Sequence, residues 1–85
     1  MNYRIEIKPV ARRAIARLPL EVRQRVAKAI DGLGLDPRPP GCKRMKGQAS
    51  FRIRIGDYRL VYDVEDNILR VLVRKVGHRK DIYDR

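Results

Sequence analysis

The middle of the chain contains two adjacent segments in which apolar and polar residues alternate. The first covers residues 51–55, FRIRI, and the second covers residues 58–64, YRLVYDV. Alternation with a period of two is typical of a β-strand that buries one face. Gly56 and Asp57 stand between the segments, and such a pair commonly forms a hairpin turn. The sequence therefore predicts an antiparallel hairpin whose arginines share one polar face.

The remaining periodic segments complete an α+β pattern. Alternation predicts a strand near the N-terminus, and apolar residues spaced three and four apart predict two short helices separated by Pro19. A Gly- and Pro-rich loop follows the helices. The last apolar run predicts a largely buried strand that ends at Gly77. The expected elements are a strand at 3–8, helices at 10–18 and 20–33, a loop at 34–42 and a strand at 68–76.

These elements predict a single domain that covers residues 1–85. The economical arrangement packs a helical hairpin on one face of a sheet, with the last three strands forming an antiparallel meander. The first strand returns beside a later one. The expected sheet therefore has four strands.

The sequence composition limits where the protein is expected to be and which kinds of chemistry it can carry. The N-terminal segment MNYRIEIKPVARR carries a charge every few residues, so it is neither a signal peptide nor a membrane span. We therefore expect a cytoplasmic protein without membrane association. Cys42 is the only cysteine, which excludes an internal disulfide and a zinc-binding cluster. No metal ion and no cofactor are expected.

The charge indicates a polyanionic partner. The chain has 21 Lys and Arg residues against 10 acidic residues, which gives a formal net charge of +11. Self-repulsion among so many positive charges disfavours a compact state. A net positive charge of this size is typical of proteins that bind nucleic acid. An acidic protein partner would satisfy the same charge.

Basic residues from distant parts of the sequence are expected to converge on the polar face of the sheet. If the helices cover the apolar face, Arg52 and Arg54 stand on the open side, and the hairpin brings Arg59 beside them. A merely solvated face usually mixes both signs of charge, so this cluster predicts a function. Guanidinium groups bind phosphate through two oxygens at once. The flanking basic residues are Lys43, Arg44, Lys46, Arg74, Lys75, Arg79 and Lys80.

The C-terminal segment GHRKDIY supplies groups suited to phosphodiester chemistry. His78 is the only histidine, Arg79 can bind an anion, and Tyr83 offers a ring and a phenol. Cleavage of RNA by its own 2′-hydroxyl needs a proton acceptor, charge stabilisation and a proton donor, and it requires no metal ion. A lone histidine near a terminus is more often ordinary than catalytic, but its neighbours make His78 a candidate.

Two segments, SFRIRIGDYRLVYDV and VGHRKDIY, resemble the RelE/ParE superfamily of toxins from toxin–antitoxin pairs, and they are closer to RelE. The resemblance extends over essentially the whole chain. It implies a RelE-like fold and a ribosome-dependent endoribonuclease that cuts messenger RNA by attack of the 2′-hydroxyl on the adjacent phosphate. It also implies a cognate antitoxin as partner, and a toxin–antitoxin complex that binds operator DNA through the antitoxin.

Individual residues match family positions. Arg59 matches the arginine of the YRLVY motif, Arg79 matches the arginine after VG, and Tyr83 matches a tyrosine near the C-terminus. In the nuclease interpretation Arg59 and Arg79 stabilise phosphate charge, and His78, which is a candidate from its own chemistry, or Tyr83 moves protons. The residues that this interpretation assigns to RNA binding are Lys46, Arg52 and Arg54.

The first hairpin strand departs from the family, which often has lysines where this chain has arginines. An arginine does not readily give up its proton, so Arg54 is a poor general base. His78, Tyr83 and Lys46 are the remaining candidates for that role. Two alternatives without cleavage stay open: a ParE-type inhibitor that binds DNA gyrase, and a general RNA-binding module. Both leave the arginine cluster and Tyr83 without a catalytic role.

Overall fold

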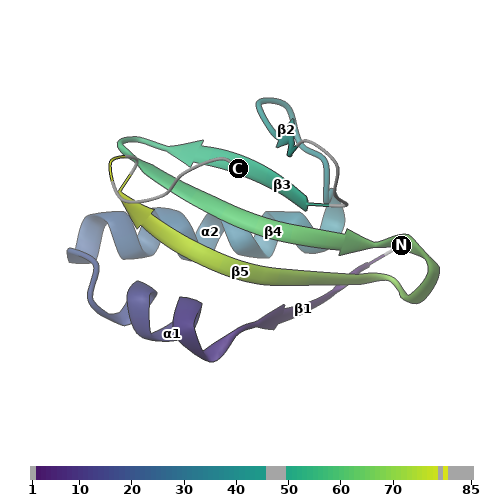
Figure 1. The fold of residues 1–85 in the computed structure, drawn as a ribbon, viewed down its shortest axis with the longest axis horizontal. Coiled ribbons are helices and arrows are strands. Elements are labelled where there is room, and N and C mark those ends of the chain that lie inside the picture. Colours follow the sequence, from purple (N-terminus) through teal and green to yellow (C-terminus); the bar gives the residue numbers. More distant parts are fainter. Residues whose placement is uncertain (1, 46–49, 79, 81–85) are drawn as a thin grey trace.

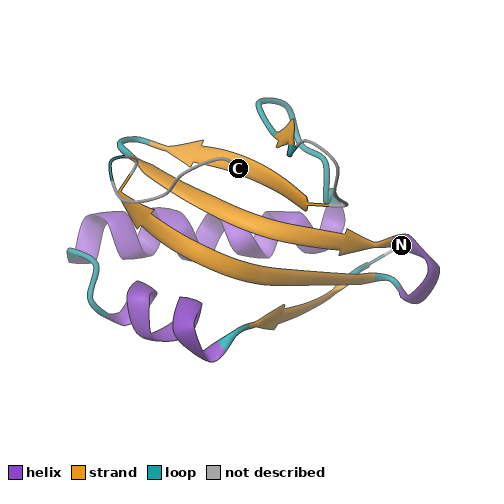
Figure 2. Ribbon diagram, in the orientation of Figure 1, coloured by secondary structure: helices purple, strands orange, loops and turns teal. Residues whose placement is uncertain are grey.

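The structure is a computed structural model that describes residues 2–45, 50–78 and 80. Its elements are β1 (Arg4–Ile7), α1 (Pro9–Ala16), α2 (Leu20–Leu35), β2 (Lys43–Arg44), β3 (Ser50–Ile55), β4 (Tyr58–Glu65), the 3₁₀ turn η1 (Asp66–Ile68) and β5 (Arg70–His78). The strands form one sheet, α2 passes behind it, and α1 lies along β5 (Figures 1 and 2).

The strands lie in the order β1-β5-β4-β3-β2. The predicted antiparallel meander is present as β3, β4 and β5, and β1 returns to pair with β5 in parallel. The predicted α+β fold is confirmed, with five strands in the sheet rather than four. The additional strand, β2, forms because the chain leaving the Pro-rich loop runs beside β3, where Lys43 pairs with Arg52 and Arg44 with Phe51.

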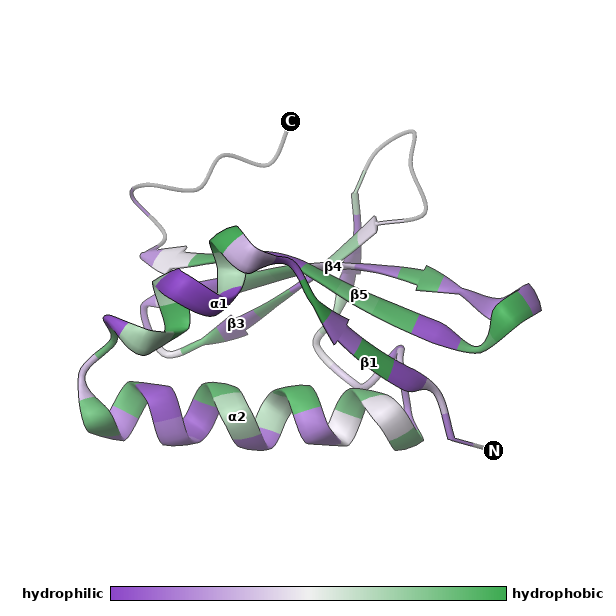
Figure 3. Cartoon of the chain, turned by 90° about the horizontal axis from the view of Figure 1, so that it is seen from below, coloured by the Kyte–Doolittle hydropathy of each residue, from purple (hydrophilic) through white to green (hydrophobic). Residues whose placement is uncertain are grey.

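The hydrophobic core lies between the helices and one face of the sheet. Leu60, Tyr62 and Val64 alternate along β4, and all three are buried. Figure 3 shows α2 as a separate layer beside the strands. Burial of a large apolar side chain is worth about 1.5–3 kcal/mol, so the alternation fixes which face of each strand meets the helices. We call the opposite face of the sheet the open face. The other core residues are Ala11, Val26, Ile30, Leu33, Phe51, Ile55, Val71, Val73 and Val76.

The predicted end of the last strand at Gly77 is wrong. Strand β5 continues through Gly77, which pairs with Arg59, to His78, which pairs with Tyr58. Glycine weakens a strand but does not prevent pairing. Because β4 begins at Tyr58, it supplies hydrogen-bond partners for this extension.

Other element ends shift by a few residues. Helix α1 ends at Ala16, and α2 continues to Leu35, so the loop that follows α2 is shorter than predicted. Strand β5 begins at Arg70 because η1 precedes it and Leu69 adopts a left-handed φ of 51°. At the hairpin turn Gly56 has a φ of 61°, a conformation that favours glycine.

The loop between α2 and β2 is tied to the end of the sheet. The buried hydroxyl of Tyr62 donates a hydrogen bond of 2.8 Å to the carbonyl oxygen of Pro37. Arg38 donates two hydrogen bonds to Asp66, of 3.1 and 2.7 Å, and its guanidinium lies 5.2 Å from the centroid of the Phe51 ring. These contacts fix the position of the loop residues that lead into β2.

Candidate nucleic-acid interface

Strand pairing gathers basic side chains on the open face. In the β3–β4 hairpin, Arg54 lies directly opposite Arg59. In the next row along the strands, Arg52 pairs with Lys43 of β2, and Lys75 of β5 lies further along the same row. Residues paired across neighbouring strands project from the same face of a sheet. We call the basic residues of these two rows the basic half of the open face: Lys43, Arg52, Arg54, Arg59 and Lys75.

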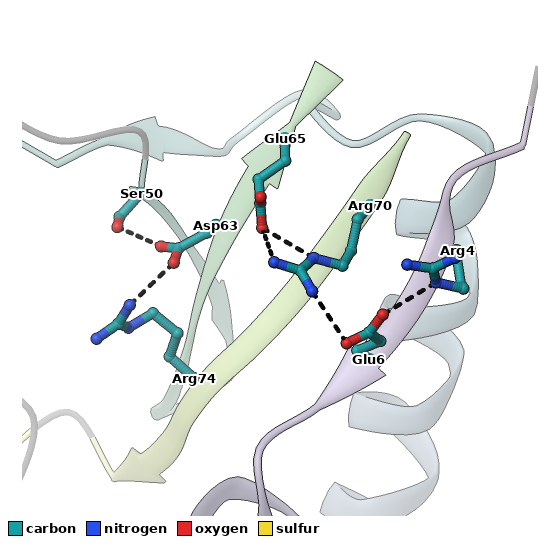
Figure 4. A network of polar contacts seen from close by, with 7 residues as sticks. All are labelled: Arg4, Glu6, Ser50, Asp63, Glu65, Arg70 and Arg74. Carbon is teal, nitrogen blue, oxygen red and sulfur yellow. Dashed lines mark hydrogen bonds and ion pairs between the residues drawn. The ribbon is translucent and has the colours of Figure 1, made fainter. Parts of the chain in front are cut away.

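The other half of the open face is electrically balanced (Figure 4). Arg70 lies between two carboxylates, with Nε 2.9 Å from Glu65 Oε1 and Nη1 3.3 Å from Glu6 Oε1. Arg74 Nη1 lies 2.9 Å from Asp63 Oδ2. The two rows of the basic half contain no acidic residue, so positive charge is concentrated there.

A pocket of about 290 Å³ opens at the basic half. Pro40 and Gly41 form part of its wall, and they belong to the loop that the Tyr62–Pro37 hydrogen bond anchors. Cationic groups beside a low-dielectric wall attract an anion more strongly than they would in open solvent. The lining residues are Pro40, Gly41, Lys43, Arg52, Ile53, Arg54 and Arg59.

The structure brings three of the predicted site residues together. Arg52, Arg54 and Arg59 all line the pocket, and the hairpin register places Arg59 beside the first strand as the alternation predicted. Other predicted site residues fall outside the described part of the chain, and their roles stay predictions. These residues are Lys46, Arg79 and Tyr83.

The structure separates His78 from the arginine cluster. The His78 and Tyr58 rings meet edge to face with their centroids 5.4 Å apart. Because Tyr58 also pairs with the buried Ile55, His78 projects toward the side of the helices, whereas Arg59 faces the open side. The backbone N–H of Lys80 donates a hydrogen bond of 3.2 Å to His78 Nδ1. The strand continues past Gly77, and this places the histidine on the helix side. The expected grouping of His78 with Arg79 and Tyr83 involves residues outside the described part of the chain and stays a prediction.

Sequence reasoning missed two features of the interface. Lys43 was expected only as a flanking charge, and the short strand β2 makes it part of the pocket. The ion pair between Arg74 and Asp63 was also missed. A signal existed in the sequence, since two residues rather than one separate Val73 from Val76, and such a break in alternation marks a β-bulge.

Within residues 2–45, 50–78 and 80, no three His, Cys, Asp or Glu side chains gather where they could hold a metal ion. None of the helices in that part of the chain is long and apolar enough to cross a membrane. The chemistry that the basic half offers is anion binding by guanidinium and ammonium groups.

Comparisons with known proteins find ParE and RelE toxins. The sequence model of a family described as ParE toxin of type II toxin–antitoxin system, parDE, matches residues 5–83. Toxin RelG of Mycobacterium tuberculosis is 33% identical over 87 residues, with 100% of both chains covered. The fold is similar to a chain of the archaeal RelE–RelB complex from Pyrococcus horikoshii OT3, with a TM-score of 0.80, 26% identity, and coverage of 96% of this chain and 100% of that one. It is also similar to the isolated E. coli RelE toxin, with a TM-score of 0.80, 27% identity, and coverage of 89% and 83% respectively.

Proposed function

The chain belongs to the ParE toxin family of type II toxin–antitoxin systems. From the resemblance of its motifs to RelE, we propose that it is a ribosome-dependent endoribonuclease that cleaves messenger RNA. The observation that carries the proposal is the pair Arg54 and Arg59, directly opposed on the open face and lining one pocket. Like charges opposite one another destabilise a sheet, so an anionic substrate would explain why two arginines face each other here.

In the proposed reaction the 2′-hydroxyl of one nucleotide gives its proton to a base and its oxygen bonds to the adjacent phosphorus. The bond from that phosphorus to the 5′ oxygen of the next nucleotide breaks, and the leaving 5′ oxygen takes up a proton from an acid. Arg59 and Arg79 stabilise the charge that builds on the phosphorane, and preorganised charges of this kind are worth orders of magnitude in rate. The arginines do not exchange protons at neutral pH, and His78 faces the other side of the sheet. Proton transfer is therefore assigned to Tyr83 or Lys46. The residues that hold the RNA backbone are Lys46, Arg52 and Arg54.

The proposal includes a cognate antitoxin as partner. The fold is also similar to a chain of the intact E. coli RelBE toxin–antitoxin complex. An acidic antitoxin segment would complement a net charge of +11 and would speed association. In this proposal the toxin–antitoxin complex binds operator DNA through the antitoxin, and the ribosomal target places the toxin in the cytoplasm.

A ParE-type inhibitor of DNA gyrase is the second candidate function. The description of the matching family, a ParE toxin, favours it. An inhibitor that only binds has no need of guanidinium groups converging in a pocket, which is why the nuclease is preferred.

Controlled expression of the toxin separates the two functions. We expect new transcript 5′ ends within coding regions, and no response to DNA damage. Arg59→Ala should abolish both toxicity and the new ends, whereas Arg12→Ala, an exposed change on α1, should remain toxic at equal protein level. A damage response without new 5′ ends would support gyrase inhibition instead.

A further inference from the structure

Strand β5 contains a bulge where it crosses the middle of the sheet. Val61 pairs with Lys75 and the next residue, Tyr62, pairs with Val73, so Arg74 has no partner of its own in the ladder. The buried Val73 lies on the helix side of the sheet, and the bulge sets Arg74 and Lys75 outside the core together. Two consecutive basic residues therefore become available at the open face, where regular alternation would offer one.

A chain of contacts orients the Arg74 side chain. The hydroxyl of Ser50, which is buried, donates a hydrogen bond to Asp63 Oδ1, and Asp63 Oδ2 accepts one from Arg74 Nη1 at 2.9 Å (Figure 4). The Asp63 side chain is 18% exposed and that of Arg74 is 41% exposed. Arg74 thus extends from a nearly buried anchor toward solvent.

The hydrogen bond to Asp63 leaves part of the Arg74 guanidinium available to bind an anion. An arginine side chain has five N–H donors, and the contact with Asp63 uses a single nitrogen, Nη1. Asp63 lies two residues from Val61 along β4, a distance of about 7 Å along the strand. The Arg74 guanidinium therefore borders the row that holds Lys43, Arg52 and Lys75.

We propose that Arg74 is a further phosphate-binding residue, and that Asp63, fixed by Ser50, positions it for the RNA backbone. The inference rests on the proposed function, and it extends the RNA-binding surface across the sheet to β5. Asp63 is a positioning residue here: it holds the guanidinium in one orientation, so less conformational freedom is lost when a phosphate binds. It is not a residue that merely cancels positive charge.

The two possible roles of Asp63 predict opposite changes in anion-binding affinity when its charge is removed. If Asp63 only cancels charge, Asp63→Asn removes a negative charge beside the interface and should strengthen binding of an anion. If Asp63 positions Arg74, the same change should weaken binding although the net charge rises by one. Asp31→Asn is the matched control, because it changes the net charge equally at an exposed position of α2.

The test measures binding of a fluorescent, single-stranded 2′-O-methyl oligonucleotide, which lacks the attacking hydroxyl, over a range of salt concentrations. Arg74→Met should reduce the log–log salt slope by about 0.7, the contribution of one phosphate contact on a single strand. Asp63→Asn should reduce the slope similarly in the parent and have no further effect in the Arg74→Met background. Asp31→Asn should keep the parent slope.

The outcomes are distinguishable. A parent slope near zero would overturn both the proposed function and this inference. Two results would overturn this inference alone. The first is a steep salt slope in the parent that Arg74→Met leaves unchanged. The second is tighter oligonucleotide binding by Asp63→Asn at the same salt slope as the parent. Thermal unfolding checks that the variants fold. If Asp63→Asn does not fold, the slope of Arg74→Met, a change at a partly exposed position, still decides whether Arg74 contacts phosphate.

Discussion

Arg54 and Arg59 occupy directly opposed positions on neighbouring strands of the β3–β4 hairpin. Opposed like charges cost the folded state free energy, typically a few tenths to about 1 kcal/mol per cross-strand pair. A protein under selection for stability alone would place a neutral or acidic residue at one of these positions. The arrangement indicates a compromise in which the site is maintained at the expense of the sheet.

We therefore expect Arg54→Thr to stabilise the fold while weakening RNA binding. Threonine suits a strand, and the change removes the opposed charge, so the free energy of unfolding should rise by about 0.2–1 kcal/mol. Urea denaturation measures this effect, and an oligonucleotide titration measures the loss of affinity. Arg12→Thr on α1 removes the same charge away from the sheet and should not stabilise the protein. Equal stabilisation by both changes would mean that net charge, rather than the opposed pair, sets the cost.

The hydrogen bond from Tyr62 to Pro37 gives a second prediction. Tyr62→Phe leaves the Pro37 carbonyl oxygen without its donor in a buried position, which should cost about 1–3 kcal/mol of stability. Burial raises the pKa of Tyr62 well above its ordinary value, so its hydroxyl remains a donor throughout the neutral range. Because the loop carries Pro40 and Gly41, the variant should also bind oligonucleotide less tightly.

Tyr58→Phe is the control for this prediction. Within the described residues the Tyr58 hydroxyl makes no hydrogen bond, so its removal should cost little in urea denaturation. Equal losses in the two variants would contradict the role given to the Tyr62 hydroxyl.

The sequence predicted the hairpin and its arginine face because strand alternation is a local signal. Residues 51–55 and 58–64 can each bury only one face, and a two-residue turn leaves one register, which brings Arg59 beside Arg54. Family resemblance then supplied the function that we propose, which the fold alone does not carry. The parts of the site that depend on local periodicity were therefore predictable.

The parts that depend on long-range pairing were not predicted. Strand β2 has two residues, too few to show any period, and its pairing with β3 is what makes Lys43 part of the pocket. The sequence predicted a tail from His78 because glycine weakens a strand, and only the length of β4 shows that pairing continues. His78 lies two residues after the buried Val76, so strand alternation through Gly77 puts its side chain on the helix side.

Asp66 gives a prediction about acid stability. Hydrogen bonds from Arg38 and from Tyr3 lower the pKa of Asp66 to about 2 from an ordinary value of 3.8. Because the folded state favours the ionised form, the stabilisation is complete above the ordinary value and is lost as the pH falls toward 2. Asp66→Asn should therefore be less stable than the parent at pH 6, and the difference should shrink at pH 2.

Urea denaturation at several pH values measures this convergence. Asp31→Asn provides the control, since Asp31 is exposed on α2 and should show no such convergence. A difference between Asp66→Asn and the parent that stays constant from pH 6 to pH 2 would show that the contacts of Asp66 do not depend on its charge.

The position of His78 gives the last prediction. A histidine that transfers a proton in RNA cleavage must reach the phosphate that Arg59 is proposed to bind, yet strand pairing puts His78 against Tyr58 on the other side of the sheet. We expect His78→Gln to cleave ribosome-bound messenger RNA at close to the parent rate in single-turnover assays. Loss of a general acid or base usually lowers the rate by about a hundredfold or more. Arg59→Ala in the same assay shows the size of a true catalytic loss. A hundredfold decrease for His78→Gln, with oligonucleotide binding intact, would assign proton transfer to His78 and require the C-terminal end of β5 to rearrange on the ribosome.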